Sequence, residues 1–95
     1  MEQSNPSILV IDPDTASRNY LSVMLRKSGY PVFLAPSGRE GLISVWKDLP
    51  SAVILDPALP DMQGVDLVKR LRQDRRTEAV PCIALSSQEN LEEMS

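Results

Sequence analysis

Acidic and hydroxyl side chains follow three apolar runs of this sequence, and these side chains are the best suited to chemistry. Asp12 and Asp14 follow the run Ile8–Ile11, Asp56 follows Val53–Leu55, and Ser86 follows Cys82–Leu85. Short apolar runs that end in turn-forming residues are typical of buried parallel strands. Because the carboxyl ends of parallel strands meet at one edge of a sheet, where α/β proteins bind ligands, we expect these side chains to converge on one crevice.

The aspartates Asp12, Asp14 and Asp56 would repel one another in such a crevice unless a cation lay among them. A small set of oxygen ligands without nitrogen or sulfur donors suits Mg²⁺, which often shares its site with a phosphoryl group. An aspartate beside this cation can itself accept a phosphoryl group, and Ser86 could donate a hydrogen bond to a phosphoryl oxygen. The alternative interpretation is that these residues only end strands and form turns.

Strands alternate with helices along the chain. The predicted strands cover residues 8–11, 32–35, 52–55 and 80–85, and the predicted helices begin at residue 14 or 15, at residue 38, at about residue 65 and at residue 88. Pro57, Pro60 and Gly64 prevent a strand or helix from continuing after Asp56, so this aspartate is placed on a loop. The β-α-β-α-β-α-β-α order predicts an α/β domain with a parallel sheet and right-handed crossovers.

The composition describes one small domain and argues against several classes of function. The 95 residues carry a net charge of −3, which disfavours non-specific binding to nucleic acid or to an anionic membrane. The chain has no histidine and one cysteine, so a serine–histidine triad, a zinc site and an internal disulfide have no support. No run approaches membrane-spanning length and the first residues lack an apolar signal core, which predicts a cytoplasmic protein.

Several motifs resemble those of the receiver domains of two-component response regulators, and the resemblance covers essentially the whole chain. The most specific match is Leu55-Asp56 with residues 59–64, which is similar to the family's phosphoacceptor aspartate and the proline, methionine and glycine that follow it. Residues 8–12 resemble the first strand with its acidic cluster, and residues 35–42 resemble the start of the second helix. Residues 80–87 resemble the fourth strand with its hydroxyl switch residue.

This resemblance implies a flavodoxin-like (CheY-like) doubly wound parallel sheet and a signalling module rather than an enzyme. By the resemblance, Asp56 accepts a phosphoryl group from a histidine kinase or a phosphotransfer protein. Asp12, Asp56 and the backbone carbonyl of Ala58 would bind Mg²⁺. Ser86 would turn toward the phosphoryl oxygen and so signal that the group is present, because a hydroxyl that bonds only the phosphorylated form favours that form.

Two departures distinguish the chain from the family pattern. The family usually has a second acidic metal ligand directly after the first, and here Pro13 occupies that position. The family's phosphate-contacting lysine and the aromatic partner of its switch residue lie on a fifth strand, which would follow Ser95. We therefore expect residues 1–95 to be the N-terminal portion of a receiver domain, without the last strand and helix. The exposed edge of the fourth strand then predicts a homodimer or association with another chain.

Two other hypotheses fit parts of the sequence. A degenerate receiver of the same fold would act only through protein contacts or dimerisation, with Asp56 as a relic, and Pro13 favours this hypothesis. Residues 8–15 also resemble the first motif of haloacid-dehalogenase-type phosphatases, in which Asp12 would be the nucleophile and Ser86 the hydroxyl of the second motif. This phosphatase hypothesis leaves the whole loop after Asp56 without a role.

Trp46 and Asp61 are prominent side chains outside the predicted crevice. Trp46 shares helical spacing with Leu42, Ile43 and Leu49, so we interpret it as partial packing of a helix. Asp61 follows a proline in a segment rich in turn-forming residues, so we interpret it as a turn residue.

Overall fold

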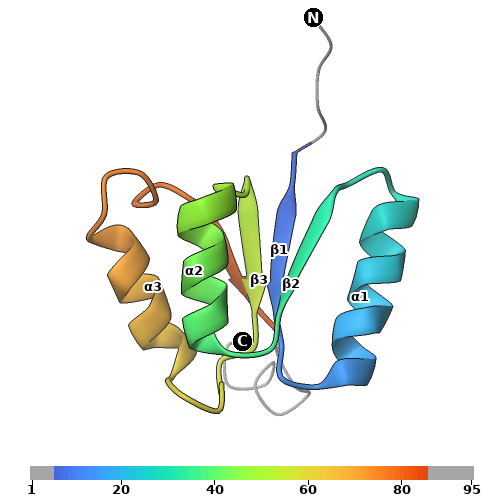
Figure 1. Cartoon of the computed structure of the whole chain (residues 1–95), viewed down its shortest axis with the longest axis horizontal. Coiled ribbons are helices and arrows are strands. Elements are labelled where there is room, and N and C mark those ends of the chain that lie inside the picture. Colours follow the sequence, from blue (N-terminus) through green and yellow to red (C-terminus); the bar gives the residue numbers. More distant parts are fainter. Residues whose placement is uncertain (1–5, 86–95) are drawn as a thin grey trace, which may run out of the picture.

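The computed structural model describes residues 6–85 as one parallel sheet with helices on both of its faces (Figure 1). The elements in chain order are β1 (Ile8–Ile11), α1 (Thr15–Lys27), β2 (Val32–Ala35), α2 (Gly38–Asp48), β3 (Ala52–Leu55), α3 (Gly64–Arg72) and β4 (Cys82–Ala84). This alternation confirms the predicted α/β fold. Among residues 6–85, no helix is both long enough and apolar enough to cross a membrane.

The strands lie side by side in the order β2-β1-β3-β4, and every neighbouring pair is parallel. The chain moves from β1 to the edge strand β2 and then returns across β1 to β3. Because crossovers between parallel strands are right-handed, this reversal places α1 on one face and α2 and α3 on the other (Figure 1). The reversal lies between β1 and β3, and in open α/β sheets ligands bind outside the carboxyl ends of two such strands.

The hydrophobic core lies between the sheet and the helices α2 and α3. Its fully or nearly fully buried members are Leu9, Ile11, Ala35, Leu42, Val45, Val53, Leu55, Leu59, Leu67 and Leu71. The opposite face, which α1 covers, buries its apolar side chains less fully, since Tyr20 of α1 is 64% exposed and Ile83 of β4 is 56% exposed. The two faces of the sheet therefore differ in how much apolar surface they remove from water.

Local capping signals explain where the helices begin and end. Asp14 caps α1 by accepting a hydrogen bond from the Ser17 backbone N–H (2.8 Å), and Ser37 caps α2 in the same way from Glu40 (3.2 Å). Gly29 follows α1 with a φ of 94°, the left-handed conformation that glycine adopts without strain. The sequence predicts that this helix begins at residue 14 or 15, and the structure places the cap at Asp14 and the first helical residue at Thr15.

The fourth strand is shorter than the predicted 80–85. Pro81 has no N–H to donate, and the Val80 N–H donates to the Thr77 carbonyl (3.1 Å), so β4 begins at Cys82. The Pro81 carbonyl still accepts a hydrogen bond from the Val53 N–H (2.9 Å). Within residues 6–85, β4 is an edge strand, as predicted. The predicted helix over residues 88–94 lies outside the described residues.

Candidate functional site

Asp12 and Asp56 occupy matching positions at the carboxyl ends of the two central strands. Ile11 of β1 and Leu55 of β3 are register partners. Asp12 directly follows Ile11 in the sequence, and Asp56 directly follows Leu55. The Asp56 N–H donates to the Ile11 carbonyl (2.9 Å), which continues the sheet ladder as far as the two aspartates. The two side chains predicted to share a crevice therefore stand on adjacent strand ends, at the reversal point of the sheet.

The Asp12 carboxylate is held in a tight local turn. Its side chain is buried, with 2% exposure, and its Oδ1 accepts a hydrogen bond from the Asp14 N–H (2.9 Å). Its backbone carbonyl accepts a hydrogen bond from the Arg18 guanidinium (2.7 Å). One carboxylate oxygen is therefore engaged within the turn, while Oδ2 has no hydrogen-bond donor among residues 6–85.

Asp14 does not join the other two aspartates. Its Oδ2 accepts the hydrogen bond from Ser17 that begins α1, and this bond is the main cause of its lowered pKa. Within residues 6–85, no three acidic, histidine or cysteine side chains lie close enough together to hold a metal ion. The expected convergence of three aspartates is therefore wrong for Asp14, whose carboxylate caps the start of α1 and joins no group of three such side chains within residues 6–85.

The Asp56 carboxylate lies half-buried at the start of the loop that joins β3 to α3. Its Oδ1 accepts a hydrogen bond from the Ala58 N–H (2.9 Å), so this oxygen is fixed by the chain two residues later. Its Oδ2 has no hydrogen-bond donor among residues 6–85. The Ala58 carbonyl likewise has no hydrogen-bond donor among residues 6–85. The loop is closed instead by the Leu59 N–H, which donates to the Met62 carbonyl, and by the Gly64 N–H, which donates to the Pro57 carbonyl.

Three oxygen atoms at this edge thus have no hydrogen-bond donor among residues 6–85 and could bind a cation: Asp12 Oδ2, Asp56 Oδ2 and the Ala58 carbonyl. All three are hard donors, and no nitrogen or sulfur ligand accompanies them. Mg²⁺ prefers such donors and keeps several of its waters, so this donor set fits magnesium better than a transition metal. Pro13 adds no ligand to the set.

Asp61 fixes the loop after Asp56 to the start of α2. Its two carboxylate oxygens accept hydrogen bonds from the Gly38 N–H (2.8 Å) and the Arg39 N–H (2.9 Å), which lowers the pKa of Asp61. Helix N-terminal N–H groups lack partners inside the helix, so a carboxylate satisfies them well. The interpretation of Asp61 as a turn residue missed this role, because its partners lie more than twenty residues earlier in the chain.

Sequence reasoning also missed Arg18, which supports the Asp12 turn. A cation in the first turns of a helix is unfavourable to the helix dipole, and this misplaced charge was the available signal of a structural role. Ser86, the predicted switch residue, lies outside the described residues. The residue before it, Leu85, donates its N–H to the Leu55 carbonyl (2.8 Å) beside Asp56.

Known proteins with similar sequences and structures are receiver domains or contain them. Residues 8–95 match the family model of the response regulator receiver domain. The transcriptional regulatory protein AfsQ1 of Streptomyces coelicolor is 35% identical over 82 residues, which are 86% of this chain and 35% of AfsQ1. The chain spans about a third of the length of AfsQ1 and of other curated relatives that it matches.

Two solved structures extend the likeness to three dimensions. The chemotaxis response regulator CheY4 of Vibrio cholerae has a TM-score of 0.83 at 28% identity and covers 95% of this chain and 78% of its own. The receiver domain of the sensor histidine kinase PA1611 of Pseudomonas aeruginosa has a TM-score of 0.83 at 26% identity, covers 90% of this chain and 70% of its own, and holds a magnesium ion in its active-site cleft.

The family match and the sheet order agree with each other, and neither supports the haloacid-dehalogenase hypothesis. The match covers nearly the whole chain and includes the strand ends that carry Asp12 and Asp56. The chain therefore belongs to the family of response regulator receiver domains.

Proposed function

We propose that Asp56 accepts a phosphoryl group from a histidine kinase or a phosphotransfer protein, and that the chain is a signalling module of a two-component phosphorelay. The observation that carries the proposal is Asp56 Oδ2, which has no hydrogen-bond donor among residues 6–85 and stands on a strand end adjacent to the buried Asp12. Membership of the receiver family supports the same assignment.

The proposed step is a transfer between two nucleophiles. A carboxylate oxygen of Asp56 attacks the phosphorus atom of a phosphohistidine, so an O–P bond forms while the P–N bond breaks. The electron pair of the broken bond returns to the imidazole nitrogen, and Asp56 becomes an acyl phosphate. A carboxylate carries no proton to remove, so the step needs no general base, and the chain has no histidine to act as one.

Mg²⁺, when bound, supplies positive charge that reduces the repulsion between the carboxylates and the incoming phosphoryl oxygens. Asp12, Asp56 and the Ala58 carbonyl would be its protein ligands, since each keeps an oxygen that accepts no hydrogen bond from the described part of the chain. The magnesium ion in the PA1611 receiver domain supports a site of this kind. Ser86 is the proposed hydroxyl that bonds the phosphoryl oxygen and thereby favours the phosphorylated conformation.

The proposal is tested by incubating the chain with acetyl phosphate and Mg²⁺ and measuring its intact mass. We expect a gain of one phosphoryl group that is absent in the Asp56→Asn variant. Asp74→Asn is the matched control, because Asp74 is a carboxylate of the segment between α3 and β4, where it pairs with Arg76. No gain in the wild-type chain, or an equal gain in Asp56→Asn, would contradict the proposal.

A degenerate receiver remains the second candidate, and Pro13 is the observation that favours it. Without a second acidic ligand, Mg²⁺ binding is weaker, and the fold could then act only through protein contacts. The mass measurement separates the two candidates, since a degenerate receiver takes up no phosphoryl group at any Mg²⁺ concentration.

We also propose that the edge strand β4 associates with a second copy of the chain in the cytoplasm. Within residues 6–85, β4 is an edge strand, so its outer backbone groups are ready partners for another strand, and Ile83 beside them is 56% exposed. Light scattering should give the mass of a dimer, and Ile83→Lys should return the chain to a monomer. A monomer before the substitution would refute this association.

A further inference from the structure

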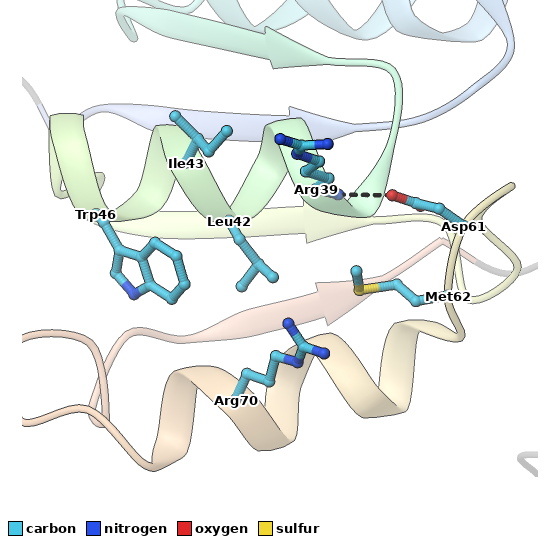
Figure 2. Close-up of a pocket in the computed structure, with 7 residues that line it drawn as sticks. All are labelled: Arg39, Leu42, Ile43, Trp46, Asp61, Met62 and Arg70. Atoms are coloured by element: carbon cyan, nitrogen blue, oxygen red, sulfur yellow. Dashed lines mark hydrogen bonds between the residues drawn. The ribbon is translucent and has the colours of Figure 1, made fainter.

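A groove between α2 and α3 has no part in the proposed phosphotransfer. It has a volume of about 510 Å³, within the range of ligand-binding clefts, and its apolar lining is Leu42, Ile43, Trp46 and Met62. Figure 2 shows Leu42 on the floor, with Trp46 toward one end and Met62 toward the other. Met62 belongs to the loop after Asp56, so the groove adjoins the candidate site.

The groove leaves large apolar side chains open to solvent. Ile43 is 51% exposed and Trp46 is 36% exposed, although both lie on a helix whose other face enters the core. Trp46 was interpreted as partial helix packing, but its ring lines this groove. Tryptophan in a groove is typical of the centre of a protein interface, where it contributes a large buried area.

Two guanidinium groups border the same groove on opposite sides of Leu42. They belong to Arg39 of α2 and Arg70 of α3 (Figure 2). Within residues 6–85, neither guanidinium makes a hydrogen bond or an ion pair, and the one ion pair joins Arg76 to Asp74.

The carboxylate that lines the groove attracts the charge of Arg39 but bonds directly to neither guanidinium. It belongs to Asp61, whose two oxygens are occupied by the N–H groups of Gly38 and Arg39. Two positive charges beside an apolar floor are therefore available to a ligand. An arginine fork matches a carboxylate in shape as well as in charge.

We propose that this groove binds an acidic peptide segment of a partner protein, in which an aliphatic or aromatic side chain lies between two carboxylates. The apolar side chain would pack over Leu42, against Trp46, and the carboxylates would pair with Arg39 and Arg70. A second copy of this chain is a poorer occupant. A symmetric contact would bring both arginines of one copy against the same arginines of the other, and like charges repel.

Trp46 provides a direct test, because it is the sole tryptophan of the chain. The probe is a short capped peptide with leucines at helical spacing and glutamates between them, and its control replaces each glutamate by lysine. We expect the acidic peptide to change the Trp46 emission in a saturable way, and the lysine peptide to bind at least about tenfold more weakly. Added salt should weaken the binding.

A matched pair of variants separates the groove from the overall charge of the chain. Arg39→Gln/Arg70→Gln removes both proposed contacts, and Lys27→Gln/Arg75→Gln removes two exposed cations that do not line the groove. We expect the first variant to bind the acidic peptide about tenfold more weakly and the second to bind it nearly as the wild type does. Circular dichroism should show that both variants are folded.

The unphosphorylated chain is used throughout, so the result does not depend on whether Asp56 accepts a phosphoryl group. Equal affinity of the acidic and lysine peptides, or equal weakening in both double variants, would overturn the proposal. So would the absence of an emission change up to about 1 mM acidic peptide. An emission change that follows protein concentration without peptide, with a doubled mass in light scattering, would assign the groove to a second copy.

Discussion

The loops that carry the two aspartates of the candidate site are built in different ways. The side-chain hydrogen bonds of the loop after β1, residues 12–14, are short-range: the Asp12 carboxylate accepts from the Asp14 N–H, and the Arg18 guanidinium donates to the Asp12 carbonyl. The loop after β3, residues 57–63, is held by a distant element, because Asp61 binds the first N–H groups of α2. We refer to these segments as the Asp12 loop and the acceptor loop.

This difference indicates which part of the site depends on the rest of the fold. The acceptor loop is fixed by the start of α2 and by the close approach of Gly64 to Pro57, so its shape is a property of the whole domain. Apart from the sheet bond between the Asp12 N–H and the Ala35 carbonyl (3.0 Å), the Asp12 loop makes its bonds within six residues of Asp12 and leaves Pro13 exposed. A substitution in the acceptor loop should therefore disturb the domain more than one in the Asp12 loop.

Gly64→Ala should produce the largest loss of stability. A Cβ at this position would lie 3.0 Å from the Pro57 Cα and 3.0 Å from Leu55 Cδ1, and the backbone atom cannot rotate away. We expect a decrease of about 2 kcal/mol in the free energy of unfolding, measured with urea, even though alanine favours helix. Pro13→Ala in the Asp12 loop should lower it by less than about 1 kcal/mol. Equal losses would show that the two loops are alike in rigidity.

Pro13→Asp should tighten Mg²⁺ binding. It supplies a second carboxylate next to Asp12, at a position where the exposed proline offers no ligand. We expect an affinity gain of about tenfold by isothermal titration calorimetry, and a smaller gain for Pro13→Asn, which adds an oxygen without a charge. A gain that is the same for both substitutions would mean that the charge does not reach the metal.

Asp61→Ala should lower the melting temperature more than Asp14→Ala. Asp61 accepts hydrogen bonds from two N–H groups and joins two elements, whereas Asp14 accepts from one N–H of its own helix. We expect Asp61→Ala to lower Tm by roughly 5 °C and Asp14→Ala by less, as followed by circular dichroism. The reverse order would contradict the distinction between a tertiary and a local cap.

The smallest effect should appear in the pH dependence of stability. Hydrogen bonds from Arg39 and Gly38 lower the pKa of Asp61 below its ordinary value of 3.8. A pKa lowered in the folded state contributes stability above the unfolded pKa, and this contribution is lost as the pH falls through the folded value. Asp61→Asn should therefore weaken the loss of stability below about pH 4. An unchanged acid profile would mean that the Asp61 charge is not linked to folding.

The sequence is sufficient to predict the helices and strands and to place the residues at the strand ends. The bounds of β1, β2 and β3 were predicted because each strand is an unbroken apolar run that stops at a polar or turn-forming residue. The placement of Asp12 and Asp56 followed from the parallel topology alone, since register partners end at the same edge. These features depend on residues that are close together in the chain.

Features that depend on distant partners could not be predicted. The role of Asp61 depends on Gly38 and Arg39, and neither residue carries a sequence signal for a carboxylate from another loop. Asp14 could cap a helix or bind a metal, and the sequence is compatible with both roles, so only the folded structure distinguishes them. The groove at Trp46 likewise exists only once α2 and α3 lie side by side.

The most direct test of the candidate site compares Asp12 with Asp14 during phosphorylation. The rate at which acetyl phosphate adds a phosphoryl group would be measured by intact mass at increasing Mg²⁺ concentrations, in the wild type, Asp12→Asn and Asp14→Asn. We expect Asp12→Asn to need at least about tenfold more Mg²⁺ and Asp14→Asn to behave as the wild type. A phosphoryl group that is never added to the wild type, or an equal loss in Asp14→Asn, would contradict the site described.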